Sequence, residues 1–243
     1  MKFLRPLFLS SLFMLISQVA CASSGLIQLS VYDRAQELTL DKVDYGNKTY
    51  IVGNPANEYQ VVLKNPTQKP LLAVVSVGGI NVISGETASP NQSGYVLDPG
   101  ETLEIKGWRK SMAETAAFYF TEHKDSYAAR IGRGNNTGVI GVAVFKAKAA
   151  SSARLFEPQR QEASRDAAPS APKEAMEQKL GTGHGRSENS SARYADFQRA
   201  SSIPDEIVML YYDSYRNLVA KGVLAPCEPL AFPARFVTDP PRS

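Results

Sequence analysis

Val139-Ile140-Gly141-Val142-Ala143-Val144-Phe145 is the stretch that decides the fold. Alternate positions of a β-strand face opposite sides, and in this run the odd-numbered and the even-numbered residues both lack polar side chains. A strand at an edge, or with one face in water, carries polar residues at alternate positions. The run therefore predicts a central strand that is covered on both faces, and 116–120 predicts another by the same reasoning.

Further strands are predicted on the N-terminal side of this run. Residues 59–63 place apolar side chains at every second position, which is the period of a half-buried strand. Gly78-Gly79 separates the apolar runs 71–77 and 80–83 and predicts a tight hairpin, because both central residues of that turn need positive φ. Pro99-Gly100 predicts a second turn, since Pro presets φ and Gly supplies the positive φ that follows.

Strands at such short intervals, with no convincing helix between them, indicate a mainly β fold. We predict an antiparallel β-sandwich of the immunoglobulin-like kind over residues 23–146, after a leader over residues 1–22. A closed barrel is the alternative, because the same strand spacing suits it.

The composition changes twice after residue 146. Residues 147–179 are mostly Ala, Ser, Pro and charged residues, which bury too little apolar surface to offset the entropy of ordering them. We predict a flexible linker there. Residues 180–243 are apolar and aromatic again, and they predict a small C-terminal module with a proline-rich tail. Within that module, 203–224 favours a β-hairpin, with a helix as the alternative.

The N-terminal residues predict export. Lys2 and Arg5 precede an apolar run that reaches Ala20, and the small residues Ala20 and Ala22 mark a signal-peptidase site before Ser23. The run is short for a lasting transmembrane anchor, although an uncleaved N-terminal helix is an alternative. We predict a soluble periplasmic or secreted chain with no transmembrane segment after cleavage.

Cys21 and Cys227 are the two cysteines. Cys21 leaves lipidation open, because a bacterial lipoprotein carries a cysteine directly after its cleavage site, which would anchor the protein in the envelope. Gln18 argues against this, since a polar residue stands there in place of an apolar one. Removal of the leader would leave Cys227 alone, so we expect no internal disulfide.

The charges restrict the partners. The chain has 27 basic and 24 acidic residues and a formal net charge of +3. Loss of Lys2 and Arg5 with the leader makes the numbers of basic and acidic residues nearly equal. This argues against nucleic acid or anionic lipid held by net charge. The sequence predicts no particular oligomeric state.

His123 and His184 are the two histidines, and the only candidates for histidine chemistry. Glu122, His123 and Asp125 are metal-ligand types, but adjacent strand residues point to opposite sides, so a solvated hairpin tip is the main interpretation. His184 lies in Gly181-Thr182-Gly183-His184-Gly185, which we interpret as a flexible or tightly turned loop, with a binding loop as the alternative. The sequence has no nucleophile elbow and no paired-cysteine spacing, and we predict no catalytic residue, metal or cofactor.

Two aromatic clusters are candidates for partner contacts. Trp108 precedes Arg109, and Tyr211-Tyr212 lies close to Tyr215. Trp, Tyr and Arg are enriched where proteins bind partners, but they also suit the core and rim of a sandwich. With His184, the residues Trp108, Arg109, Tyr211 and Tyr212 are the candidate contacts.

Several segments carry a family resemblance: Gly94-Tyr95-Val96-Leu97-Asp98-Pro99, Gly107-Trp108-Arg109-Lys110-Ser111, Asp125-Ser126-Tyr127-Ala128-Ala129-Arg130, Leu180-Gly181-Thr182-Gly183-His184-Gly185 and Asp213-Ser214-Tyr215. Together with the run from Val139, they resemble a group of uncharacterised exported proteins of proteobacteria. The resemblance covers most of the chain after the leader, apart from the linker. It implies a bacterial envelope location, gives partial support to the C-terminal hairpin, and implies no activity.

These observations predict a non-catalytic binding or interaction protein of the bacterial periplasm or cell envelope. Its partner would be another envelope protein or a polymer. The alternative is an envelope enzyme of unfamiliar, hydrolase-like type that uses His184 or the Glu122/His123/Asp125 cluster.

Overall fold

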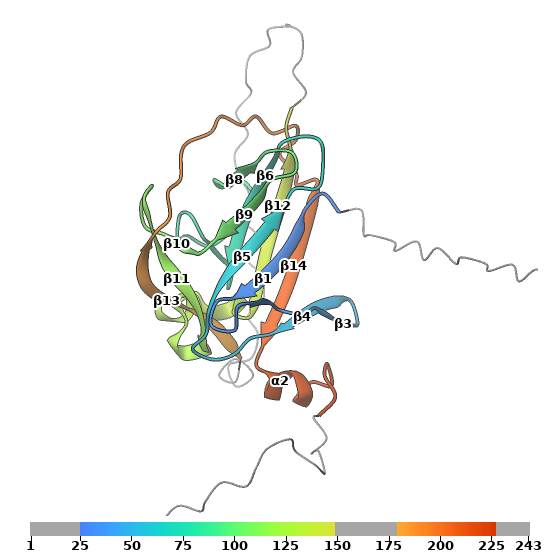
Figure 1. Ribbon diagram of the computed structural model, residues 1–243, viewed down its shortest axis with the longest axis vertical. Coiled ribbons are helices and arrows are strands. Elements are labelled where there is room, and N and C mark those ends of the chain that lie inside the picture. The colour runs from blue at the N-terminus through green and yellow to red at the C-terminus, as the bar shows by residue number, and fades with distance from the viewer. Residues whose placement is uncertain (1–24, 149–178, 227–243) are drawn as a thin grey trace, which may run out of the picture.

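The computed structural model describes residues 25–148 and 179–226 of the chain (Figure 1). The predicted leader with Cys21, residues 149–178 of the predicted linker, and residues 227–243 with Cys227 lie outside the described residues. Within the described ranges, no helix has both the length and the apolar character needed to cross a membrane.

Two β-sheets of seven strands each make up the described part of the protein (Figure 1). The first sheet has the order β10-β11-β5-β1-β2, with β13 also paired to β11 and β9 also paired to β5. Its strands are β1 (Gln28–Asp33), β2 (Leu38–Thr39), β5 (Glu58–Lys64), β9 (Thr102–Ile105), β10 (Gly107–Arg109), β11 (Glu114–Glu122) and β13 (Leu180–Asn189).

The second sheet has the order β3-β4-β14-β12-β6-β7, with β8 also paired to β6. Its strands are β3 (Val43–Tyr45), β4 (Lys48–Val52), β6 (Leu71–Val77), β7 (Ile80–Asn81), β8 (Tyr95–Leu97), β12 (Val139–Lys146) and β14 (Glu206–Asp213). β14 and β4 run parallel, whereas β12 is antiparallel to both of its neighbours. Three short helical elements lie between β11 and β12: η1 (His123–Asp125), α1 (Tyr127–Arg130) and η2 (Gly134–Asn136). Helix α2 (Tyr215–Ala220) follows β14.

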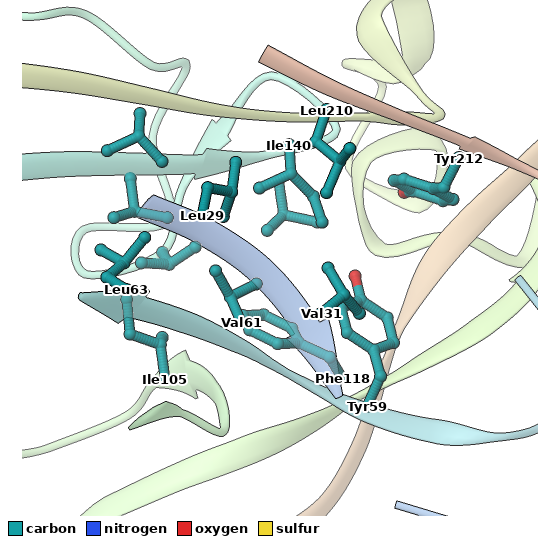
Figure 2. Packing of buried hydrophobic residues seen from close by; sticks show 14 of the residues in the cluster. Leu29, Val31, Tyr59, Val61, Leu63, Ile105, Phe118, Ile140, Leu210 and Tyr212 are labelled. Carbon is teal, nitrogen blue, oxygen red and sulfur yellow. The ribbon is translucent and has the colours of Figure 1, made fainter. Parts of the chain in front are cut away.

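One hydrophobic core lies between the inner faces of the two sheets. Figure 2 shows Val61 and Leu63 of the first sheet in the same cluster as Ile140 and Leu210 of the second. Tyr59, Val61 and Leu63 are all fully buried, as the alternation over 59–63 predicts, but Gln60 on the opposite face is buried as well. The fold is therefore mainly β and is built from two packed layers.

The central-strand prediction for 139–145 is confirmed. β12 pairs with β6 on one side and with β14 on the other. Ile140, Val142 and Val144 face the core and are fully buried. Phe145 points to the other face, where it is also fully buried in a second, smaller apolar cluster. The run is therefore central in its sheet and fully covered on the core face, whereas on the other face Phe145 is buried and Val139, Gly141 and Ala143 are only half-buried.

The two predicted turns are also confirmed. One joins two strands of the same sheet, and the other joins the two sheets. Gly78 and Gly79 have φ values of 59° and 77° and join β6 to β7 as a hairpin. Gly100 has a φ of 75°, and its turn closes with a 3.1 Å hydrogen bond from the Glu101 N–H to the Asp98 carbonyl. This second turn passes from β8 of the second sheet to β9 of the first, so it brings the two layers together at one side.

The prediction of a separate C-terminal module is wrong for the described residues. β13 pairs with β11 along most of its length, and β14 pairs with β12 and β4. Leu180, Leu210 and Tyr212 enter the common core. An isolated pair of strands is at best marginally stable in water, whereas these strands bury their apolar faces by completing the two existing sheets.

The predicted hairpin over 203–224 is also wrong, and so is a single helix over that range. The segment forms strand β14 and then helix α2. Asp213 and Ser214 begin the helix instead of turning a hairpin: the Ser214 hydroxyl accepts a 3.3 Å hydrogen bond from the Asn217 N–H, and Asp213 Oδ1 accepts one of 2.7 Å from the Asn217 side chain. A Ser at this position satisfies an N–H group that has no partner within the helix.

Candidate functional site

A groove lies on the side of the protein where β8 passes to β9. Residues 190–202, which connect β13 to β14, cross this side as an extended segment that we call the arch (Figure 1). A cavity of about 1500 Å³ lies between the arch and the sheets, lined by residues of β8, β9 and the arch itself.

Hydrogen bonds hold the arch at both ends. At the β13 end, the Ser190 N–H donates to the Ala113 carbonyl at 2.7 Å and the Ala192 N–H donates to the Met112 carbonyl at 2.8 Å. At the β14 end, the Ala200 N–H donates to the Lys146 carbonyl at 2.9 Å. These bonds fix the width of the groove, because each end is attached to a strand or turn of a different sheet.

The apolar side of the groove comes from the outer face of the second sheet. Leu72 of β6 and Val96 of β8 are cross-strand partners and both line the cavity. Phe197 of the arch packs against the apolar cluster of Leu72, Val74 and Phe145. Leu72 is buried, whereas Val96 and Phe197 are half-buried, so part of this apolar surface faces the cavity.

Three arginines line the groove: Arg193 is exposed, whereas Arg109 and Arg199 make hydrogen bonds within the protein. Arg109, at the end of β10, donates hydrogen bonds to the Ser190 carbonyl and, at 3.5 Å, to the Tyr95 hydroxyl. Arg199 of the arch donates to the carbonyls of Pro90 and Gln92, at 2.8 and 2.6 Å. Neither guanidinium takes part in an ion pair with a carboxylate of residues 25–148 or 179–226.

The environment of Arg199 is partly apolar. Its guanidinium carbon lies 4.2 Å from the centre of the Phe145 ring. Burial lowers the pKa of Arg199 from its ordinary value, because desolvation disfavours the charged form. Three acidic residues line the same cavity: Asp98 and Glu101 at the turn between β8 and β9, and Glu104 in β9. The groove therefore has an apolar side, an acidic rim and a cationic group at the arch.

The predicted contact residues do not form one site. Arg109 lines the groove, but Trp108 is buried in the core, where its indole N–H donates to the Gly183 carbonyl at 3.0 Å. Tyr212 is also buried in the core. Tyr211 is half-buried on the outer face of the second sheet, with its ring 5.6 Å from that of Tyr50.

The prediction of a glycine-rich loop is wrong, because the segment is part of β13. A Cβ atom on Gly183 would lie 2.1 Å from the Tyr119 ring, and one on Gly185 would lie 2.8 Å from the Ala117 carbonyl oxygen. The glycines thus allow close approach of the neighbouring strand β11. His184 is exposed at this strand, with its ring 5.5 Å from that of Tyr127.

Glu122, His123 and Asp125 lie where β11 ends and η1 begins. Glu122 forms an ion pair of 3.1 Å with Lys124, and the His123 ring lies against Gly134. In the described ranges, no three His, Cys, Asp or Glu side chains are grouped as a metal site would need.

A buried polar cluster in the core has no part in the groove. The hydroxyls of Tyr59 and Tyr212 both lie within hydrogen-bond distance of Thr182 Oγ1. Burial, followed by the proximity of Tyr212, raises the pKa of Tyr59 well above its ordinary value, and burial raises the pKa of Tyr212 to about 12. Both phenols are therefore neutral near pH 7, which suits a structural role.

A second apolar surface lies on the outer face of β14 and just before it. Ile203, Ile207 and Met209 are 73%, 59% and 53% exposed. Ile207 and Met209 are the cross-strand partners of Ala143 and Gly141. This surface is the main competitor of the groove for an apolar ligand.

The sequence analysis missed the groove residues Arg199, Phe197 and Leu72. Phe197 and Tyr194 are the two aromatic residues among the polar and small residues of 190–202, which was the one available signal. No protein-family model matches the chain, and neither a curated protein nor a solved structure matches it.

Proposed function

We propose that this chain is a non-catalytic binding protein of the bacterial periplasm or cell envelope, and that its ligand occupies the groove under the arch. The observation that carries the proposal is the half-buried apolar surface of Val96 and Phe197 inside a cavity of about 1500 Å³. Ligand sites are typically concave and mostly apolar, with a few polar groups that fix orientation. Arg109 and Arg199 supply such groups here.

The location and the family are part of the same proposal. The leader pattern supports export, and the quoted segments support kinship with exported proteins of proteobacteria. Intact mass of the purified protein tests the leader, and we expect a chain that begins at Ser23. A mass that includes an acylated Cys21 would instead assign the protein to a membrane surface. The immunoglobulin-like type of sandwich stays a prediction, supported by the two packed sheets.

Binding of a neutral apolar probe tests the groove. N-phenyl-1-naphthylamine becomes more fluorescent in apolar surroundings, and we expect saturable binding to the mature chain. Ser93 is exposed and lines the groove, so Ser93→Trp should fill part of it and weaken binding. Asn135 is exposed in η2, away from the residues that line the groove, so Asn135→Trp is the matched control and should bind as the unmodified chain does. Equal binding by both variants would contradict the proposed site.

A further inference from the structure

We propose that the groove under the arch takes a single-chain amphiphile with an anionic head, and that Arg199 holds the head. The inference rests on the proposed function, because it names the ligand class of the same groove. It requires an apolar wall for the hydrocarbon tail of the ligand, and a cation that forms no ion pair within the protein for the head.

The apolar wall is continuous with a packed cluster. Leu72, Val96 and Phe197 line the cavity and belong to, or pack against, the cluster on the outer face of the second sheet. Val96 and Phe197 are half-buried and so still have apolar surface to lose to a ligand. An unbranched hydrocarbon chain gains from such a wall in proportion to the area that it covers.

The charge of Arg199 is compensated only by neutral groups of the described chain. Its bonds go to the carbonyls of Pro90 and Gln92, and its guanidinium lies over the Phe145 ring. A guanidinium has more N–H donors than these two bonds use, so it retains capacity for a carboxylate. Burial also lowers the pKa of Arg199, which indicates that water stabilises this charge poorly. An anionic head would restore that stabilisation through charge-assisted hydrogen bonds.

The other charges of the groove favour one orientation. Asp98 and Glu101 at the turn between β8 and β9, and Glu104 in β9, line the cavity and would repel an anionic head. Arg109 and Arg199 both use their two terminal nitrogens in hydrogen bonds within the protein, but only Arg199 is seen to lie over Phe145, a member of the apolar cluster that forms the wall. Arg193 also lines the cavity, but it is exposed, and an ion pair in contact with water contributes little. We therefore place the head at Arg199, beside the apolar wall, and not at the other two arginines or at the acidic rim.

Three probes that share an eight-carbon tail separate the contributions of head and tail to the affinity. Octanoate, octan-1-ol and octylammonium are titrated into the mature chain, and dissociation constants are measured by calorimetry or NMR. We expect octanoate to bind about tenfold more tightly than octan-1-ol, because one charge-assisted hydrogen-bonded pair is of that size. Octylammonium should bind more weakly than octanoate, because Arg199 would repel its head.

Two variants of Arg199 test whether this residue causes the preference for octanoate over octan-1-ol. Arg199→Gln should abolish the difference between octanoate and octan-1-ol, whereas Arg199→Lys should retain part of it. Arg216 is exposed in α2, away from the residues that line the groove, so Arg216→Gln removes an equal charge and should leave the preference intact. If Arg199→Gln also loses octan-1-ol, the lysine variant decides: a retained preference supports the proposal and a lost one overturns it.

The failures of the two proposals are distinguishable. Equal binding of octanoate and octan-1-ol by the unmodified protein would overturn the proposal of an anionic head, but not the proposal that the groove is the binding site. A preference that survives Arg199→Gln would overturn the role of Arg199. No binding of any of the three probes, with no binding of the neutral fluorescent probe, would overturn the proposed function itself.

Discussion

Tyr59 and Tyr212 come from different sheets, and both place their hydroxyl oxygens within hydrogen-bond distance of Thr182 Oγ1, at 2.6 and 2.7 Å. Tyr59 belongs to β5, Tyr212 to β14, and Thr182 to β13. Figure 2 shows both tyrosines among the buried side chains of the core. A polar cluster inside an apolar core specifies how the sheets are aligned, because displacement of either sheet would leave a buried hydroxyl without a partner.

The first prediction concerns the pH dependence of stability. Tyr212 has an ordinary pKa of 10.0 and a pKa of about 12 in the folded protein. The folded state thus retains the proton longer than the unfolded state. The stabilisation is complete below pH 10 and is lost as the pH rises through 12.

Tyr212→Phe removes this titrating group and one hydrogen bond. At pH 7 we expect a loss of about 1 kcal/mol in the free energy of unfolding, since Thr182 keeps its bond with Tyr59. Between pH 10 and 12 the variant should lose stability less steeply than the unmodified chain. Denaturant melts at a series of pH values measure both effects, and parallel curves for the two proteins would contradict the prediction.

The second prediction compares two valines. Val142 is fully buried in β12 and faces the core, whereas Val62 is half-buried in β5, on the face that also carries Gln60 and Lys64. Val142→Ala should cost about 2 kcal/mol or more, from lost burial and the cavity that remains. Val62→Ala should cost distinctly less. Equal and small losses in denaturant melts would show that β12 is not a central strand.

The third prediction compares two strand glycines. A Cβ on Gly107 would lie 2.0 Å from the Ala116 carbonyl oxygen, which is backbone and unable to turn aside. A Cβ on Gly141 would meet the Ser76 hydroxyl at 2.9 Å, and that side chain is free to rotate. Gly107→Ala should therefore destabilise the fold strongly, by about 3 kcal/mol or more, and Gly141→Ala only slightly. Similar melting temperatures for both variants would refute this account.

Local patterns were sufficient to predict β12, β5 and the Gly78-Gly79 hairpin, because period-two alternation and positive-φ glycines act within a few residues. The C-terminal strands were misjudged for the opposite reason. β13 and β14 find their partners far away along the chain, in β11 and β12, and nothing near them in sequence indicates this pairing. The glycines of β13 were interpreted as a loop. In the structure they allow Tyr119 and strand β11 to approach closely, and a contact with a distant strand cannot be recognised from the local sequence.

The groove could not be predicted from the sequence for the same physical reason. Arg199 and Phe197 lie in a mainly polar segment, and they reach β8 because β13 and β14 end in different sheets, so that the chain between them must cross one side of the protein. Only Arg109 was among the predicted contacts. The apolar run 71–77 identified the strand of Leu72 but gave no sign of which face a ligand would meet, and no strand was predicted at Val96.

Amide chemical-shift mapping with octan-1-ol tests the binding groove most directly. The unmodified mature chain is titrated, and the residues whose backbone signals move are identified. The account predicts that the changes concentrate in β8 and in the arch, around Val96, Phe197 and Arg199. Changes confined to Ile207, Met209 and their neighbours on β14 would mean that the ligand binds the exposed outer face, and they would contradict the groove as the binding site.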